Sequence, residues 1–275
     1  MSDNTSSVAD AIEVTDGQGP VVVLLSAMGT AMGYWGGVRD LLSTGSTVIA
    51  YDRPGVGIAP PRRPPNPPLP FSGFAAELDE LLAGLGIEEP VVLVGHSLGD
   101  LIALAFAARW PQRVAGMVHV DGSMLNMGPT KLDAMLVDTD DPAKEHGVGT
   151  EVDRLRCCYE LTGAPIPTGT PCVTLTRAWG WWRPEFGPQA PQQDLRWHTY
   201  HAELARRWGG PWLVATDAGH YLPVEAPGLV AHAIDQVVRA VRDGADEATL
   251  DPDLVAAAGA RLADPHAPIS RDPNP

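Results

Sequence analysis

The chain has 275 residues, of which 44 % are hydrophobic and 19 % are charged. This balance suits one packed globular domain, or one domain with an insertion, and excludes a largely disordered chain. The formal net charge is −15, and so acidic a surface repels phosphate backbones and anionic lipid headgroups. We therefore expect a small-molecule substrate, with neither nucleic acid nor a membrane as partner, whereas the sequence does not indicate an oligomeric state.

The first residues and the cysteines indicate the compartment. The polar, acidic start lacks the basic and apolar segments of a secretory signal, and no stretch approaches the roughly 20 apolar residues that span a bilayer. The cysteines are Cys157, Cys158 and Cys172, a spacing that fits neither a disulfide framework nor a zinc site. We expect a cytoplasmic protein with reduced thiols, no metal and no other cofactor.

Short apolar segments alternate with amphipathic helical segments along the chain. Two stretches, 74–85 and 229–241, repeat apolar residues at helical spacing. The segments predicted as strands are unbroken and rich in β-branched residues, and they cover 20–25, 46–51, 91–94, 114–120, 172–176 and 212–216. This alternation predicts an α/β fold: a mostly parallel twisted sheet with helices on both faces.

Two segments interrupt the alternation, and a third follows it. Residues 54–70 are too rich in proline for a helix or a central strand, and they predict a stiff surface loop. The long stretch between the strands at 114–120 and 172–176 is typical of a small helical cap over a binding site. The tail is rich in Asp, Ala and Pro, with one short helix. The predicted organisation is a first core part at 1–122, a cap at 123–170, a second core part at 171–243 and a C-terminal extension at 244–275.

The clearest chemical signal is Ser97, which lies in the sequence Gly-His-Ser-Leu-Gly (95–99). A predicted strand precedes this G-x-S-x-G pattern and a predicted helix follows it. The sharp strand-to-helix turn strains the backbone of the serine, and the small residues beside it relieve the crowding. A serine at this place is also a good helix N-cap. The combined context favours a nucleophile.

A serine hydroxyl becomes a nucleophile only when a neighbouring base removes its proton. His220 follows the last predicted strand, and the carboxyl ends of parallel strands meet at one edge of the sheet. We therefore expect His220 to reach Ser97. His96 is expected to pack beside the nucleophile, and His119, within a strand, to belong to the core.

The imidazole of the base needs a carboxylate that fixes its tautomer. The strand at 172–176 is followed by "RAWGWW", which holds no carboxylate, whereas the strand at 114–120 is followed by Asp121. Asp121 is the predicted acid. Asp217, Glu185 and Asp194 remain alternatives.

An acyl-transfer site also needs two N–H donors for the oxyanion. The amide of Leu98, directly after the nucleophile, is one predicted donor. The amide of Met28, in the loop after the first predicted strand, is the other.

These motifs resemble the α/β-hydrolase superfamily. The resemblance covers about residues 12–243 and depends on "GHSLG", "YDRPGVG", "AGHYLPVEAP" and the order serine, acid, histidine. It implies the α/β-hydrolase fold, in a serine-nucleophile, esterase-like branch. It also implies Ser97 as the nucleophile, His220 as the general base, and Met28 and Leu98 as oxyanion donors.

The chain departs from this family at three places. Ser26-Ala27 stands where many members have His-Gly, and Asp100 stands where a glycine often follows the elbow. The acid follows the strand at 114–120, as in a minority of the superfamily. A serine rather than an aspartate at the elbow argues against epoxide hydrolases and haloalkane dehalogenases, and it points to acyl chemistry.

Large apolar and aromatic side chains near these motifs predict a hydrophobic pocket, with packing of the cap on the core as the alternative. The predicted pocket residues are Tyr34, Trp35, Met124, Leu125, Met127 and Trp181. The leading interpretation is a cofactor-free serine hydrolase of a small hydrophobic ester or related acyl compound. The alternatives are a non-hydrolytic biosynthetic enzyme (cyclase, lyase or perhydrolase-like) and a ligand-binding protein without turnover.

Overall fold

The structure is a computed structural model that describes residues 8–43, 45–62, 68–124, 151–153, 156–157, 160–161, 164–181 and 187–269. Most of the predicted cap lies outside the described residues. Leu125 and Met127, two predicted pocket residues, lie outside them, and so does Glu185, one of the alternative acids.

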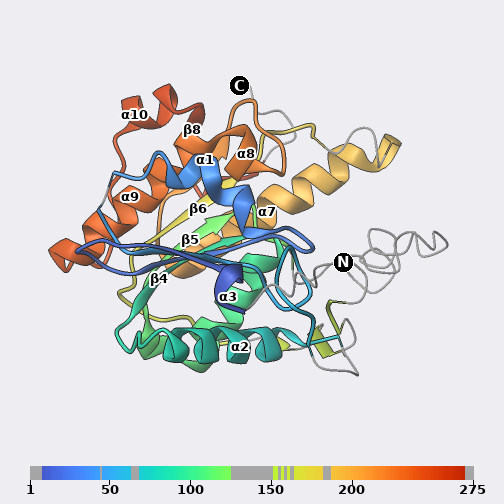
Figure 1. Ribbon diagram of the computed structural model, residues 1–275. Coiled ribbons are helices and arrows are strands. Elements are labelled where there is room, and N and C mark those ends of the chain that lie inside the picture. Colours follow the sequence, from blue (N-terminus) through green and yellow to red (C-terminus); the bar gives the residue numbers. More distant parts are fainter. Residues whose placement is uncertain are drawn as a thin grey trace.

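The described residues form an eight-stranded sheet with the order β1-β3-β2-β4-β5-β6-β7-β8 (Figure 1). The strands are β1 (Ile12–Thr15), β2 (Val22–Leu25), β3 (Val48–Tyr51), β4 (Val91–His96), β5 (Val114–Val120), β6 (Cys172–Thr176), β7 (Trp212–Ala215) and β8 (Ala260–Ala263). The six central strands are parallel to one another, namely β3, β2, β4, β5, β6 and β7. Strands β1 and β8 pair antiparallel at the two edges. The predicted mostly parallel sheet is confirmed.

The strand order reverses next to β2, which pairs with β3 on one side and with β4 on the other. Connections leave the sheet in opposite directions at such a point, and they open a crevice at the carboxyl ends of the two strands. The loop that begins at Ser26 follows β2, and Ser97 follows β4. The topology therefore brings the two predicted parts of an acyl-transfer site to the same crevice.

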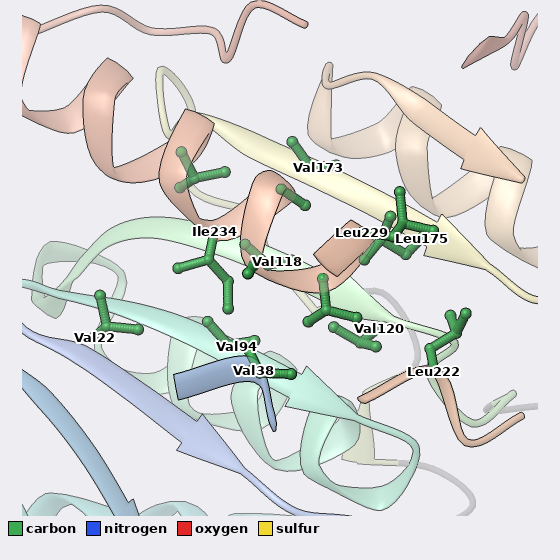
Figure 2. Close-up of a cluster of buried hydrophobic side chains, with 14 of the residues drawn as sticks. Val22, Val38, Val94, Val118, Val120, Val173, Leu175, Leu222, Leu229 and Ile234 are labelled. Atoms are coloured by element: carbon green, nitrogen blue, oxygen red, sulfur yellow. The ribbon is translucent and has the colours of Figure 1, made fainter. Parts of the chain in front are cut away.

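Both faces of the sheet are apolar because alternate residues of each central strand point to opposite sides. In β2, Val22 and Leu24 belong to one core cluster, whereas Val23 and Leu25 belong to the other. Figure 2 shows the first cluster, in which Ile234 of the covering helix lies beside Val118 of β5, and Leu229 of the same helix lies beside Leu175 of β6. Unbroken apolar strands are what this two-sided burial requires.

Helices cover the two faces (Figure 1). On one side lie α1 (Gly36–Arg39) and α9 (Pro227–Asp243), beside the short α8 (Leu222–Glu225). On the other lie α2 (Phe71–Gly84), α3 (Leu98–Arg109) and the carboxyl end of α7 (Ala190–Trp208). Within the part of the chain that the structure describes, no helix is both long and apolar enough to cross a membrane.

The C-terminal extension adds to the core. The short helix α10 (Pro252–Ala257) contributes the fully buried Val255, and β8 then pairs with β7. The sequence predicted the short helix but not the strand after it. Residues 244–263 thus complete one edge of the sheet and one corner of the core.

The described end of the predicted cap returns to the core on the side of α2 and α3. Val152 pairs with Leu69 through an isolated bridge, and Cys157 and Leu161 are buried in the cluster beneath these helices. This return brings Glu151 to the crevice at the carboxyl ends of the strands.

Candidate active site

Ser97 connects β4 to α3 in a strained backbone conformation, with φ 54° and ψ −115°. Among the residues that the structure describes, the non-glycine residues with positive φ are Ser97 and Asp121 (φ 43°). Side chains with a Cβ rarely adopt positive φ, and such strain gathers at functional sites, where the surrounding structure holds it in place. Two of the three predicted catalytic residues thus have a strained backbone.

The turn at Ser97 is tight because Gly95 and Gly99, two positions before and after the serine, lack a Cβ. A Cβ on Gly99 would overlap the carbonyl oxygen of Leu25, and one on Gly95 would overlap the backbone of Asp100. The two glycines therefore let α3 begin directly against β2.

We expect Gly99→Ala to lower the free energy of unfolding by about 1–3 kcal/mol and to impair activity, because the added methyl group forces α3 away from β2. Urea unfolding and turnover of the same protein measure the two effects. Gly84→Ala is the matched control, since nothing lies within 4 Å of a Cβ at that helical position. A Gly99→Ala protein as stable and as active as the native one would contradict this account of the turn.

Ser97, His220 and Asp121 lie together at the carboxyl edge of the sheet. His220 Nε2 is 3.1 Å from Ser97 Oγ, and His220 Nδ1 is 2.7 Å from Asp121 Oδ2. A carboxylate only accepts, so Nδ1 carries the proton and Nε2 is left to accept the serine proton. Asp121 is fully buried and the His220 side chain is 14 % exposed, which lets a substrate reach the imidazole. The arrangement can pass a proton from a nucleophile to a leaving group.

Arg53 holds the loop after β2 in place. This loop contains the predicted donor Met28. The Arg53 guanidinium donates to the carbonyl oxygens of Ser26 (2.7 Å) and Ala27 (2.8 Å), and it forms a buried ion pair with Glu151 (2.6 Å). Arg53 belongs to "YDRPGVG", so this motif supports the loop beside the nucleophile. The second predicted donor, the Leu98 amide, lies in the first turn of α3, next to Ser97.

A family model described as "alpha/beta hydrolase fold" matches residues 20–143. The chain is 35 % identical over 103 residues to a putative carbamate hydrolase, RutD, of Cronobacter turicensis, a match that covers 38 % of each chain. A thermophilic esterase of Thermogutta terrifontis has a TM-score of 0.54 at 21 % identity, over 84 % of this chain and 93 % of that one. A putative lipase of Acinetobacter baumannii has a TM-score of 0.58 at 18 % identity, over 86 % of this chain and 91 % of that one.

The family model covers the switch in strand order, the elbow and the strand before Asp121, and the structural matches extend the fold over most of the chain. The chain has the α/β-hydrolase fold. The match to the curated relatives spans less than two-fifths of their length. These matches show the fold, and the geometry of the site is the basis for a proposal about activity.

The carboxylate of Asp121 has three partners besides His220. Oδ1 accepts from Trp197 Nε1 (2.6 Å) and from the Arg177 backbone N–H (3.0 Å), and the Arg177 guanidinium lies 3.5 Å from Oδ2. Burial alone would raise the pKa of the Asp121 carboxyl, but the Arg177 charge and the His220 hydrogen bond outweigh it and hold the pKa far below its usual range. Asp121 is therefore ionised at neutral pH.

Arg177 follows β6 directly, at the place where many members of the superfamily have their acid. Its fully buried guanidinium pairs with Asp194 (3.3 Å) as well as Asp121, and it lies 4.2 Å from the ring centre of Trp197. Burial lowers the pKa of Arg177, and the two carboxylates oppose that shift. The residue directly after β6 is thus the cation Arg177, which orients Asp121, the carboxylate that follows the neighbouring strand β5.

The alternative acids have other environments. Asp194 binds Arg177 and the backbone N–H of Gly180 (2.8 Å), and so supports Asp121 indirectly. Asp217 is exposed, three residues before His220. The geometry therefore favours Asp121 over both as the partner of His220.

We expect Arg177→Met to lower activity, most of all at acid pH. Without the guanidinium, burial raises the pKa of Asp121, so the carboxylate that fixes His220 becomes protonated at a higher pH than in the native enzyme. The acid limb of the kcat/KM profile should move to higher pH, and the loss of the cation that pairs with the buried Asp194 should cost about 3 kcal/mol of stability. Profiles from about pH 4 to pH 8 measure the shift. Arg62→Met, which removes a distant pair with Glu77, is the control, and superimposable profiles would contradict this role.

His96 anchors the loop that contains His220, the predicted base. Its Nε2 lies 2.7 Å from the backbone oxygen of His220, and its Nδ1 lies 3.3 Å from the Tyr34 hydroxyl. Burial, together with the His220 charge, lowers the pKa of His96 to about 3, so the ring is neutral. Nε2 must then carry the proton and donate to the His220 carbonyl, while Nδ1 accepts from Tyr34. His96 does pack beside the nucleophile, as predicted, and it also anchors the loop.

Three predicted pocket residues lie near the triad. Tyr34 stacks on His96 with ring centres 5.4 Å apart, and Trp181 lies 6.1 Å from His220 between ring centres. Met124 is partly buried and packs beside Trp197. The sequence missed Tyr221, whose half-exposed ring lies 6.4 Å from both Tyr34 and Trp181 and whose position directly after His220 was a usable signal.

The prediction that Trp35 lines the pocket is wrong. The Trp35 side chain is fully buried in the cluster beneath α9, and its Nε1 donates to Ser26 Oγ (3.0 Å). Trp35 belongs to the core because the short helix Met32–Trp35 turns its last residue toward the sheet, whereas Tyr34 remains at the site.

Asp100 lies in the first turn of α3 and pairs with a residue of the neighbouring strand. Its fully buried carboxylate lies 2.6 Å from Nδ1 of His119 in β5. This pair lies behind the elbow and joins the first turn of α3 to the strand that carries Asp121. His119 is thus a core residue, as predicted, with a polar partner that the sequence did not suggest.

Proposed function

We propose that the protein is a serine hydrolase that cleaves a small hydrophobic ester or a related acyl compound through an acyl-enzyme. One observation carries the proposal: His220 lies 3.1 Å from Ser97 Oγ and 2.7 Å from the buried carboxylate of Asp121. This is the arrangement of nucleophile, base and orienting acid that acyl transfer requires. The strained backbones of Ser97 and Asp121 support it, since the fold maintains them at a cost.

The reaction follows from the geometry. Ser97 Oγ attacks the substrate carbonyl, and its proton passes to His220 Nε2, while Asp121 stabilises the imidazolium. The oxyanion is stabilised by the amides of Leu98 and Met28, the latter in the loop that Arg53 supports. His220 gives its proton to the leaving group. Water then attacks the acyl-enzyme by the same steps and frees Ser97.

The surroundings of the triad favour an apolar acyl group. Aromatic rings of Tyr34, Trp181 and Tyr221 gather around His220 and His96. The described cation nearest to Asp121, Arg177, is fully buried and therefore does not face a substrate. The partial match to a putative carbamate hydrolase widens the proposed class from esters to carbamates, which share the attacked carbonyl.

A fluorophosphonate probe tests the proposal, because it phosphonylates only serines that a neighbouring base activates. We expect one label per chain, on the peptide that contains Ser97, together with hydrolysis of short esters or carbamates in a substrate panel. A labelled protein that turns over no member of the panel would favour the non-hydrolytic alternatives. A folded protein that is neither labelled nor active would refute the proposal.

A further inference from the structure

A second hydroxyl group touches the nucleophile. Ser123 Oγ lies 3.1 Å from Ser97 Oγ, and the Ser123 backbone N–H donates to the Ser97 carbonyl oxygen at 3.2 Å. Ser123 follows Asp121 by two residues, so the strained turn after β5 that presents the acid also presents this serine. Both serines are largely shielded from solvent.

The proton positions follow from donor and acceptor capacities. Asp121 accepts from His220 Nδ1, so Nε2 is the acceptor for the single proton of the Ser97 hydroxyl. Ser97 Oγ then has no proton left for Ser123, and the 3.1 Å contact between the two oxygens requires Ser123 to donate. In the state ready for attack, Ser123 O–H points at the oxygen that reacts.

We propose that Ser123 is a further catalytic residue, whose hydroxyl donates a hydrogen bond to Ser97 Oγ and stabilises negative charge on that oxygen. The inference rests on the proposed function, since it assigns Ser123 a part in the same acyl transfer. The proton of Ser123 stays on its own oxygen throughout, so no additional reactant is needed.

The benefit is larger in deacylation than in acylation. In acylation the C–Oγ bond forms from a neutral hydroxyl, which already accepts the Ser123 hydrogen bond before the reaction begins. In deacylation water bonds to the carbonyl carbon and gives a proton to His220. The C–Oγ bond then breaks, its electron pair moves to Ser97 Oγ, and His220 returns the proton there. The ester oxygen of the acyl-enzyme is a weak acceptor, whereas the departing oxygen is a strong one. The Ser123 bond therefore strengthens as Ser97 leaves.

Pre-steady-state kinetics with a chromogenic ester separate the two steps. The rate of the burst reports acylation, and the steady-state rate after it reports deacylation. We expect Ser123→Ala to slow deacylation by about ten- to a hundred-fold, the usual loss for a hydrogen bond to a charged group. Acylation should change by less, so the acyl-enzyme accumulates and intact mass reveals it. Ser123→Thr keeps a hydroxyl and should restore deacylation to near the native rate, and Ser123→Gly is a second variant without the group.

The outcomes distinguish this inference from the proposed function. If native protein takes up the fluorophosphonate on Ser97 but Ser123→Ala and Ser123→Gly deacylate at the native rate, the role of Ser123 is refuted and the serine hydrolase stands. Slow deacylation in Ser123→Thr equal to that in Ser123→Ala would also refute it, because the loss would then follow side-chain shape instead of the hydroxyl. Native protein that shows neither a label nor a burst would overturn both.

Discussion

Replacing Ser97 with alanine is expected to lower kcat by about 10⁵–10⁶, the scale on which the loss of a triad nucleophile acts. Without Oγ no acyl-enzyme forms, and His220 has no hydroxyl to deprotonate. Alanine at φ 54° bears the same backbone strain as serine, so the elbow should keep its shape. Turnover of the best ester or carbamate from the panel measures the loss, and circular dichroism checks the fold.

Ser43→Ala serves as the control for this variant, since Ser43 is exposed and donates a hydrogen bond to Asp235 of α9. It should leave kcat within about twofold of the native value, as surface substitutions usually do. A Ser97→Ala enzyme with native-like turnover would eliminate the acyl-enzyme and leave His220 as an acid–base group for a non-hydrolytic reaction.

Asp121→Asn should be the next most damaging change, with a loss of about 10⁴ in kcat. An asparagine at this place no longer fixes the proton on His220 Nδ1, so Nε2 is no longer the obligatory acceptor for Ser97. It also removes one of the two carboxylates that pair with the buried Arg177, and some loss of stability should accompany the loss of activity.

The exposed Asp217 provides the matched control, because it is a carboxylate of the same loop as His220 and an alternative acid on sequence grounds alone. Asp217→Asn should retain near-native turnover. The reverse result, an active Asp121→Asn and an impaired Asp217→Asn, would reassign the acid and require the loop around His220 to rearrange.

The triad was predictable because each of its members has a local signal. Ser97 lies in a G-x-S-x-G pattern between a strand and a helix, and Asp121 and His220 each follow the end of a parallel strand. Such strands end at one edge, so three residues far apart in the sequence share one place in the fold. The same rule identifies Arg177, directly after β6, as a residue of the site, although it does not say that a cation there would hold the acid.

The contacts around Asp121 were not predictable, since they depend on how α7 docks on β6. The buried face of α7 carries Asp194, His198 and His201 among its apolar residues, so polar side chains interrupt the apolar stripe that indicates a packed helix. Trp197 reaches Asp121 only because this polar face lies against the sheet. Helical periodicity alone does not predict that the polar residues of this face contact the sheet.

The edge strands escaped prediction for a similar reason. In β1 (Ile12–Thr15) most residues are exposed, and in β8 two of the four are exposed. An edge strand packs little of its surface, so its sequence carries a weak hydrophobic pattern. Tyr34 and Trp35 are neighbouring aromatic residues, yet Tyr34 lies at the site and Trp35 in the core. The sequence alone does not distinguish these two places.

The central claim is that Ser97, activated through His220 and Asp121, becomes covalently acylated. The most direct measurement mixes the native protein with a chromogenic ester, quenches the reaction in acid within the burst, and maps the peptides by mass. We predict that the peptide with Ser97 is heavier by the acyl group, and that the adduct is absent from Ser97→Ala. Turnover of the ester at native rate with no acyl adduct on Ser97 at any time would contradict the account.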